Sequence, residues 1–293
     1  MFERFDTVQN AMMRDYTTLR LGGPADWLVT PASEEELLLA LREAEEHSLP
    51  VTVIGQGSNL LVLDGGIRGV VIRTRGLKRS TVEGDLLTAE GGVMMGAAAS
   101  LAAEKGLSGL EFASGIPGTV GGGVVMNAGA YDGEMSRVTV EVTTVSASGE
   151  IRTRRGEEMA FGYRTSALQA GGEIVTRAVF RLEPGNPGEI RARMADLNHR
   201  RMEKQPLDVP SAGSTFKRPQ GAFAAALIDQ CGLKGYAVGG AQVSRKHAGF
   251  LVNTGDSAAD YLTLVRTVQR IVEERTGIRL ETEIRILGDE QEP

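Results

Sequence analysis

Hydrophobic and polar residues along the first 75 positions follow a pattern that predicts a small α/β lobe. Ser33 precedes three glutamates in a capping-box pattern, and apolar residues then recur at helical spacing as far as Ala44. Short apolar runs bounded by turn residues predict buried strands. Three such strands are expected here, at 51–54, 60–63 and 70–72. The pattern therefore indicates a strand-helix-strand arrangement that ends near residue 75.

A second lobe is predicted over residues 76–185, with more strands than the first. An apolar helix is expected over Met94–Lys105, because Gly106 follows it in the position where helices commonly end. A hairpin turn is expected at Ser148-Gly149. The strands of this lobe are expected at 86–89, 138–145, 151–154 and 174–182.

A third domain is predicted over residues 186–293, after a linker at Pro184–Gly188. Ser257 is the expected N-cap of its longest helix, and Gly277 the expected end. Its helices are expected at about 190–204, 223–231 and 260–276, and its final strand at 278–287.

Glycine is the one residue type whose abundance changes this picture. The chain has 38 glycines in 293 residues, nearly twice the average usage of about 7%. They form short clusters between apolar runs and follow no Gly-X-Y period. Clustered glycine indicates backbone that turns tightly or approaches another group closely.

Charge and rare residues exclude several classes of function. A net charge of −6 disfavours a nucleic-acid-binding surface. A single cysteine and three separated histidines disfavour a disulfide or a metal site. Neither a secretion signal nor an apolar run long enough for a membrane helix is visible, so a cytoplasmic protein is expected, with no membrane and no nucleic acid as partner.

Two glycine clusters are candidates for binding a phosphate-bearing ligand. The first, Gly55–Asn59, lacks the glycine that a Rossmann fingerprint needs at position 60, and a strand rather than a helix is expected after it. The second is Gly115–Gly123. Glycine alone fits tight turns and a diphosphate cradle of main-chain N–H groups equally well. Ser58 and Asn59 favour the cradle.

With these residues in view, the chain resembles the UDP-N-acetylenolpyruvoylglucosamine reductases, flavoenzymes of peptidoglycan synthesis. The ordered set of motifs carries the resemblance, because any one of them alone is weak. The matching stretches are Thr17–Ala25, Gly55–Leu61, Gly115–Gly122, Met126–Tyr131, Phe161–Ser166, Ala212–Lys217, Leu233–Gly235 and Glu281–Arg285.

The resemblance implies an α+β protein with an FAD-binding fold of the vanillyl-alcohol-oxidase type. Two α/β lobes, 1–75 and 76–185, would hold non-covalent FAD. The third domain would bind the substrate, and its last strand, at about 278–288, would return toward the flavin site. The implied reaction is the NADPH-dependent reduction of an enolpyruvyl UDP-sugar to UDP-N-acetylmuramate. No metal is implied, and a monomer or weak dimer is expected.

The resemblance also implies roles for individual residues. Arg164 would stabilise an enolate, Glu283 would share a proton with it, and Ser214 would donate a proton to carbon. The positions implied for cofactor binding are Gly55, Gln56, Gly57, Ser58, Asn59, Gly115, Ile116, Pro117, Gly118, Gly121, Gly122 and Arg285. Those implied for substrate binding are Tyr163, Lys204, Lys234 and His247.

Each of these residues also has an ordinary structural interpretation. Arg164 could form a salt bridge inside a loop, Ser214 could be a turn residue, and the lysines could be solvated. Two departures from the family pattern, Arg218 and Gly249, leave substrate contacts at those positions open. The short interval between Arg164 and Ser214 indicates the family's shorter type, which lacks a tyrosine-bearing insertion.

Two other functions fit parts of the sequence. A flavin-dependent oxidase of the same fold would typically attach FAD through histidine or cysteine, and His47 is the one candidate in the first two lobes. A regulatory nucleotide-binding module would give no reason for Arg164, Ser214 and Glu283 to occur together.

Overall fold

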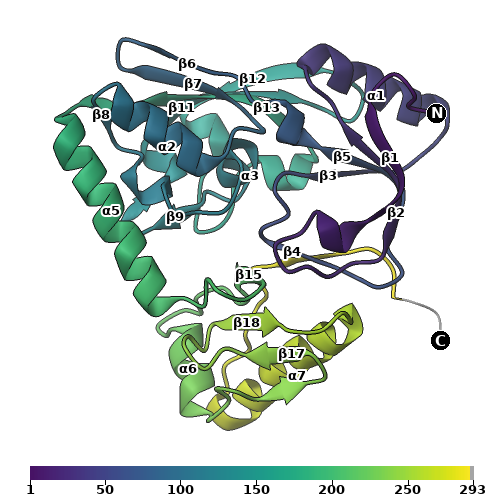
Figure 1. Cartoon of the computed structure of the whole chain (residues 1–293), viewed down its shortest axis with the longest axis vertical. Helices are drawn as coiled ribbons and strands as arrows, with labels where there is room; N and C mark the ends of the chain where they lie inside the picture. The colour runs from purple at the N-terminus through teal and green to yellow at the C-terminus, as the bar shows by residue number, and fades with distance from the viewer. Residues whose placement is uncertain (291–293) are drawn as a thin grey trace. The chain divides into compact units, whose positions relative to one another are not determined.

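The computed structural model describes residues 1–290 (Figure 1). The chain forms two compact units, each built from separate segments. Unit 1 consists of Met1–Gln9, Trp27–Gln56 and Gly69–Arg201. Unit 2 consists of Asn10–Asp26, Gly57–Arg68 and the chain from Met202 onward. The division into three parts at residues 75 and 185 stays a prediction.

The larger part of unit 1 is built on an antiparallel sheet in the order β12-β11-β13-β7-β6. The predicted hairpin is confirmed, because Gly149 turns with a φ of 80° and its N–H donates to the Ser146 carbonyl. The strands are β6 (Ser80–Glu83), β7 (Leu86–Glu90), β11 (Thr139–Val145), β12 (Ile151–Arg155) and β13 (Ile174–Arg181). The helices are α2 (Met95–Glu104), α3 (Val120–Val125), α4 (Leu168–Gly171) and α5 (Pro187–Lys204), whose last three residues belong to unit 2.

A second sheet, in the order β1-β2-β5-β3, packs against α1 (Glu34–Glu46) through a shared apolar core. The predicted cap is confirmed, because the Ser33 hydroxyl accepts a hydrogen bond from the Glu36 N–H. β3 and β5 run parallel. The strands are β1 (Asp6–Met12), β2 (Pro24–Thr30), β3 (Val51–Ile54) and β5 (Ile67–Arg73).

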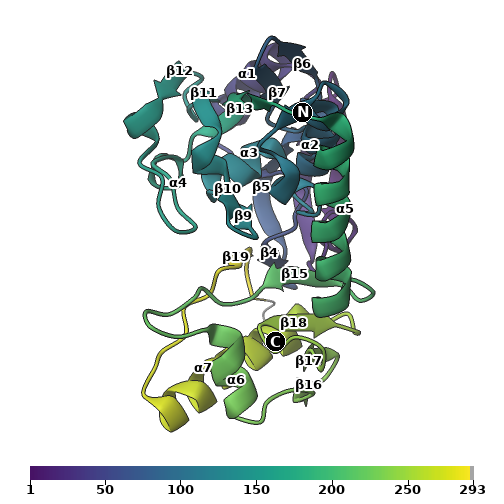
Figure 2. The same ribbon diagram turned by 90° about the vertical axis from the view of Figure 1, so that its left-hand side faces the viewer.

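Unit 2 contains a four-stranded sheet in the order β15-β18-β17-β16, with α6 and α7 on one face (Figures 1 and 2). Both predicted caps of α7 are confirmed: Ser257 accepts from the Asp260 N–H, and Gly277 is left-handed. The elements are β15 (Ser211–Ser214), α6 (Ala224–Gln230), β16 (Ala237–Val238), β17 (Ala241–Val243), β18 (Phe250–Asn253) and α7 (Ala258–Thr276).

Short elements complete the two units. The remaining strands are β4 (Leu60–Val62), β8 (Leu107–Ser108), β9 (Gly129–Ala130), β10 (Gly133–Glu134), β14 (Glu183–Pro184) and β19 (Arg285–Leu287). Short 3-10 helices lie at Met13–Asp15, Thr74–Gly76, Glu111–Ala113, Met135–Arg137 and Gly156–Met159. The mixture of antiparallel sheets and helices confirms the expected α+β class. No helix within residues 1–290 is long and apolar enough to span a membrane.

Two predicted elements are wrong. The strand expected at 278–287 is confined to Arg285–Leu287, where it pairs in parallel with β4. The residues before it form single hydrogen bonds with Thr215, Lys217 and Gln269 in place of a continuous ladder. The linker expected at Pro184–Gly188 instead holds the start of α5, because Asn186 accepts from the Gly188 N–H at 2.8 Å and so caps the helix. Proline at the first helical position is favourable because its missing N–H needs no partner there.

Candidate active site

Ser214 lies at the irregular end of strand β15 in unit 2. It is opposite Phe250 of β18, and the register between the two strands shifts just before it. Gly213 adopts a left-handed φ of 78°, which an L-residue rarely adopts. The shift breaks the regular ladder, so a side chain at this point is not constrained by regular sheet pairing. Ser214 is half-buried.

Glu283 is brought next to Ser214 although 69 positions separate them in the sequence. The Glu283 N–H donates to the Thr215 carbonyl at 2.8 Å. Phe216 and Thr282 form an isolated antiparallel bridge beside this bond. The structure therefore holds the main chains of the two predicted catalytic residues within one residue of direct contact, in the same unit.

Asn59, the last residue of the first glycine cluster, bonds with the main chain on the C-terminal side of Glu283. The Asn59 side-chain amide donates to the Glu283 carbonyl at 3.0 Å, and the Asn59 carbonyl accepts from the Arg285 N–H at 3.0 Å. Asn59 was expected only to bind cofactor. Its side chain is committed to the segment that carries Glu283, a role that no local sequence signal indicates.

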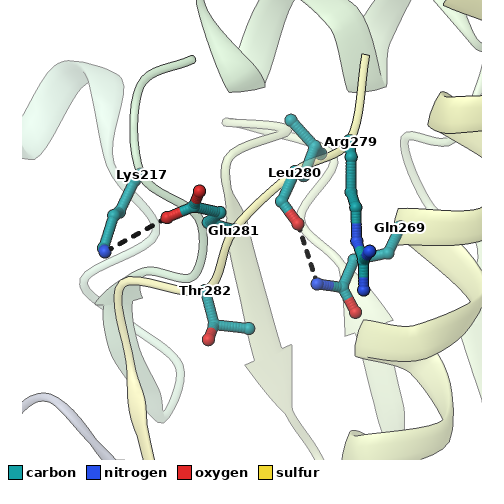
Figure 3. Close-up of a pocket in the computed structure, with 6 residues that line it drawn as sticks. All are labelled: Lys217, Gln269, Arg279, Leu280, Glu281 and Thr282. Carbon is teal, nitrogen blue, oxygen red and sulfur yellow. Dashed lines mark hydrogen bonds and ion pairs between the residues drawn. The ribbon is translucent and has the colours of Figure 1, made fainter. Parts of the chain in front are cut away.

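A polar groove of about 480 Å³ lies beside this segment (Figure 3). It is lined by Lys217, Gln269, Arg279, Leu280, Glu281 and Thr282. The Lys217 ammonium pairs with the Glu281 carboxylate at 3.3 Å, and Gln269 donates to the Leu280 carbonyl (Figure 3). Neither Ser214 nor Glu283 lines the groove, so it is distinct from the predicted catalytic pair.

Arg164, in unit 1, is held against the loop that follows the second glycine cluster. Its guanidinium donates to the Gly129 carbonyl at 3.0 Å and lies 3.5 Å from the Asn127 carbonyl. The Tyr163 ring centre lies 5.2 Å from the guanidinium carbon. The Gln169 side chain donates to the Arg164 carbonyl at 2.9 Å. These contacts fix the position of the guanidinium group.

Backbone strain is concentrated around the Arg164 guanidinium. Arg164 has a φ of 56°, and Asn127, Tyr131 and Asp132 have φ values of 42°, 49° and 66°. A non-glycine residue in this region costs about 1–3 kcal/mol, and such residues cluster at functional sites. Asn127 is buried and bonds with Gly162 and Ser136, which stabilises the strained loop. The strain supports a functional role for the loop.

Gly55, the first residue of the first glycine cluster, meets the second cluster within unit 1. A Cβ atom at Gly55 would lie 2.4 Å from the Thr119 hydroxyl, so glycine is required there by packing. Thr119 caps α3 by accepting from the Gly122 N–H, and the Gly121 N–H donates to the Gly91 carbonyl. The glycine-rich segment was not predicted as a helix, because glycine disfavours helices. Here its small size lets α3 approach Gly91 and Met95 closely.

Two arginines that bond with glycine carbonyls carry buried donors. The Nε atoms of Arg75 and Arg201 have no hydrogen-bond partner among residues 1–290. Burial lowers the pKa of both guanidinium groups, and the charge of Arg73 adds to the effect at Arg75. Arg201 bonds with the Gly115 carbonyl, and Arg75 with the Gly92 carbonyl. Desolvated cations beside glycine-rich backbone fit an anionic cofactor such as a dinucleotide.

Sequence reasoning missed Arg75 and Arg201. The arginine-rich side of the helix ending at Lys204 was a signal for Arg201, and nothing local distinguished Arg75 from other strand-end arginines.

The predicted substrate-binding residues have different surroundings. Lys204 is exposed, and Tyr163 has 53% of its surface exposed. Lys234 pairs with Asp229 at 2.7 Å. His247 contacts the Phe250 ring edge-on, and its Nδ1 accepts from the Gly249 N–H at 3.2 Å. Burial, and to a lesser degree the charge of Lys234, lower the pKa of His247, so it is neutral at pH 7.

Most of the remaining predicted cofactor positions lie in loops and at element ends, and Gly122 lies inside α3. Pro117, Gly122 and Arg285 are exposed, and Gly57 is buried. The half-buried positions are Gln56, Ser58, Ile116 and Gly118. Arg164 lies in unit 1 and the other two catalytic candidates lie in unit 2, so the convergence of all three stays a prediction.

Gly57 should be among the least replaceable residues of unit 2. It has a φ of 70°, and a Cβ there would lie 2.3 Å from the Tyr16 carbonyl oxygen. We expect Gly57→Ala to lower the free energy of unfolding by at least about 3 kcal/mol, measured by urea unfolding.

Gly221→Ala is the matched control for Gly57→Ala. Gly221 lies in the same unit with a φ of 72°, and a Cβ atom there would have nothing within 4 Å. This variant should lose only about 1–2 kcal/mol, the penalty for the left-handed conformation itself. Equal losses in the two variants would contradict the steric explanation for Gly57.

Comparison with known proteins bears on both halves of the chain. Residues 25–154 match the family described as FAD binding domain, and residues 205–287 match the C-terminal domain of UDP-N-acetylenolpyruvoylglucosamine reductase. These matches confirm the expected FAD-binding fold followed by a C-terminal domain.

Full-length relatives agree with the domain matches. The chain is similar to UDP-N-acetylenolpyruvoylglucosamine reductase of Clostridium novyi, with 46% identity over 100% of the chain and 95% of the relative. The same enzyme of Geobacillus thermodenitrificans is 46% identical over 97% of the chain and 94% of the relative. The solved structure of the Thermus caldophilus enzyme superimposes with a TM-score of 0.83 at 39% identity, covering 97% of this chain and 99% of the other. Likeness of this extent in sequence and fold places the chain in the UDP-N-acetylenolpyruvoylglucosamine reductase family.

Proposed function

We propose that this chain uses NADPH and bound FAD to reduce the enolpyruvyl ether of UDP-N-acetylglucosamine to the lactyl ether of UDP-N-acetylmuramate. Membership of the reductase family over the whole chain is the observation that carries the proposal. The reaction adds one hydride and one proton across a carbon–carbon double bond, and NADPH becomes NADP⁺. The protein is expected to act in the cytoplasm, as a monomer or weak dimer.

The residues that would hold FAD are the two glycine clusters, Arg201 at Gly115 and Arg75 at Gly92. Main-chain N–H groups of Gly55–Asn59 can approach a diphosphate, and Arg75 and Arg201 supply desolvated positive charge. In the second cluster Pro117 has no N–H, and the N–H groups of Ile116 and Gly118 donate to the Ala113 and Ile116 carbonyls, so that cluster contributes close packing more than hydrogen-bond donors. The chemistry that bound FAD would supply is transfer of a hydride from NADPH to the terminal carbon of the enolpyruvyl group. A covalent link through His47 is not supported, because its ring bonds with the Glu43 carbonyl at the end of α1.

Arg164 would stabilise the charge that develops on the substrate carboxylate. Hydride addition turns the enolpyruvyl group into an enolate with negative charge on two oxygens. A planar guanidinium can donate to both. The carbonyls of Asn127 and Gly129 hold Arg164 from one side, so the group needs little reorganisation when the charge appears.

Ser214 and Glu283 would control proton transfer to the substrate. Glu283 in its protonated form can share a hydrogen with the enolate, and Ser214 can donate its hydroxyl proton to the carbon next to the carboxylate. A carbanionic carbon is basic enough to take a proton from a hydroxyl held within hydrogen-bond reach. The bond between Glu283 and Thr215 supports this pairing of roles.

Cationic and polar side chains would bind the sugar nucleotide. Lys204 and Lys234 can attract the diphosphate, although Lys234 must exchange its pairing with Asp229. Neutral His247 and the Tyr163 phenol can form hydrogen bonds. The interval between Arg164 and Ser214 is occupied by α4, β13, β14, α5 and the start of β15, which supports assignment to the shorter type.

Anaerobic half-reactions test the proposed function. The purified protein should be yellow and lose its colour to the supernatant on acid precipitation. NADPH should bleach it, and the enolpyruvyl sugar nucleotide should restore the colour without oxygen. Reoxidation by oxygen but not by the sugar nucleotide would favour a flavin-dependent oxidase and contradict the proposal.

A further inference from the structure

Thr215 joins the two segments that carry the predicted proton donor and the predicted acid. Its side chain is fully buried. Its N–H donates to the Gly249 carbonyl at 2.9 Å, and its carbonyl accepts from the Glu283 N–H at 2.8 Å. Its hydroxyl accepts from the Leu251 N–H at 3.2 Å. All three groups of one residue are therefore used to connect strand β18 with the segment of Glu283.

The Thr215 hydroxyl compensates for the broken register of β15. Beyond the register shift, the Leu251 N–H bonds with a side chain instead of a strand carbonyl. A buried N–H without a partner is costly, so this bond fixes where Thr215 can lie. Since Ser214 precedes Thr215 directly, the same bond limits the main-chain position of Ser214.

Tyr261 supports this arrangement from within the core. Its phenol donates to the Leu251 carbonyl at 3.1 Å and lies 3.5 Å from the Thr215 hydroxyl. Burial raises the pKa of Tyr261, so the phenol stays protonated and can donate. Both polar groups of Leu251 are thus matched by a side-chain hydroxyl.

Valine and phenylalanine would fill the space that Thr215 and Tyr261 occupy. They have nearly the shapes of threonine and tyrosine and need no hydrogen-bond partners. A buried polar network restricts the core to the arrangement that satisfies every member. The hydroxyls of Thr215 and Tyr261 therefore contribute geometry that an apolar pair would not.

We propose that Thr215, held by Tyr261, is a positioning residue that fixes Ser214 relative to Glu283. The Asn59 amide donates to the Glu283 carbonyl, so the main chain of Glu283 is bonded at both its N–H and its carbonyl. The inference rests on the proposed roles of Ser214 and Glu283. Thr215 touches no reacting atom in this role and acts through its neighbours.

Replacing Thr215 with valine tests the proposal. Thr215→Val should slow reoxidation of the reduced flavin by the enolpyruvyl sugar nucleotide by about 10–100-fold, because a misplacement of about 1 Å has an effect of this size. Reduction by NADPH should change little. Thr215→Ser keeps the hydroxyl and should restore most of the rate. Tyr261→Phe, a milder change that preserves packing, should slow the same step by a smaller factor.

Hydrogen exchange gives a readout that does not depend on turnover. The amide of Glu283 should exchange faster in Thr215→Val and at the original rate in Thr215→Ser. Thr276→Val is the matched control, because the Thr276 hydroxyl donates to the Val272 carbonyl of α7 in the same unit. The control should lower thermal stability without slowing reoxidation.

Three results would overturn the positioning role. One is an equal effect of the valine variants at 215 and 276 on reoxidation. Another is a serine variant as slow as the valine variant. The third is unchanged Glu283 amide exchange in both Thr215→Val and Tyr261→Phe. If Ser214→Ala instead reoxidises normally, the proposed donor is wrong, while the exchange rates still report separately on the Thr215 link.

Discussion

Ser214→Ala should leave reduction of the flavin by NADPH intact and slow its reoxidation by the enolpyruvyl sugar nucleotide by about 10²–10⁴-fold, the range typical of a lost general acid. The two half-reactions differ because only the second delivers a proton to carbon. Alanine removes the hydroxyl and keeps the main-chain pairing with Phe250. The substitution should therefore lower the rate of proton transfer without disrupting strand β15. Stopped-flow absorbance of the flavin measures both steps separately.

Ser211→Ala is the matched control, because Ser211 opens the same strand and pairs with Val252. It should slow neither half-reaction by more than about threefold, since alanine keeps the main-chain pairing with Val252 and the change lies three residues from the proposed donor. Equal damage to both half-reactions in Ser214→Ala would remove Ser214 from the donor role. The result would then indicate a loss of cofactor binding or of folding instead.

Helix limits were predictable because their signals are local. The capping serines at 33 and 257 and the glycine at 277 act within one turn of the helix end, and all three behave as the sequence indicated. Propensity and capping chemistry suffice for such ends. The α2 helix and the 149 turn follow from equally short signals.

Elements that depend on distant partners were predicted poorly. The segment at 278–284 has the composition of a strand, but its N–H and carbonyl groups bond singly with Thr215, Lys217 and Gln269. The α3 helix forms from residues of low helix propensity because its glycines allow close approach to other segments. Neither outcome is encoded within the segment itself.

The candidate site divides in the same way. Family motifs located Ser214 and Glu283, which a residue-by-residue analysis would have interpreted as a turn residue and a solvated carboxylate. The supporting role of Asn59 and Thr215 could not be predicted from the sequence. Their hydrogen-bond partners lie more than 60 positions away or on a facing strand. Predicting the residues that support a site therefore requires the tertiary structure, whereas sequence motifs can indicate the reacting groups.

Arg164→Met should slow reoxidation by the sugar nucleotide by at least about 10²-fold, the loss expected when a charge-stabilising donor is removed. Methionine keeps much of the length of the arginine side chain but cannot donate to the carboxylate or to the carbonyls of Asn127 and Gly129. Affinity for the sugar nucleotide should fall less than the rate, because the enolate carries more charge on the oxygens than the substrate does. Rapid-mixing rates over a range of substrate concentrations separate the two effects.

Arg155→Met provides the comparison that decides the interpretation of Arg164→Met. Arg155 lies in the same unit and forms an ion pair with Glu141 at 2.6 Å, with 72% of its side chain exposed. An exposed pair of this kind contributes at most about 1 kcal/mol to stability. If Arg155→Met slowed reoxidation as much as Arg164→Met, a general loss of positive charge would explain both. If only affinity fell in Arg164→Met, the guanidinium would bind the substrate without stabilising the enolate, and the strained loop that holds it would serve recognition rather than catalysis.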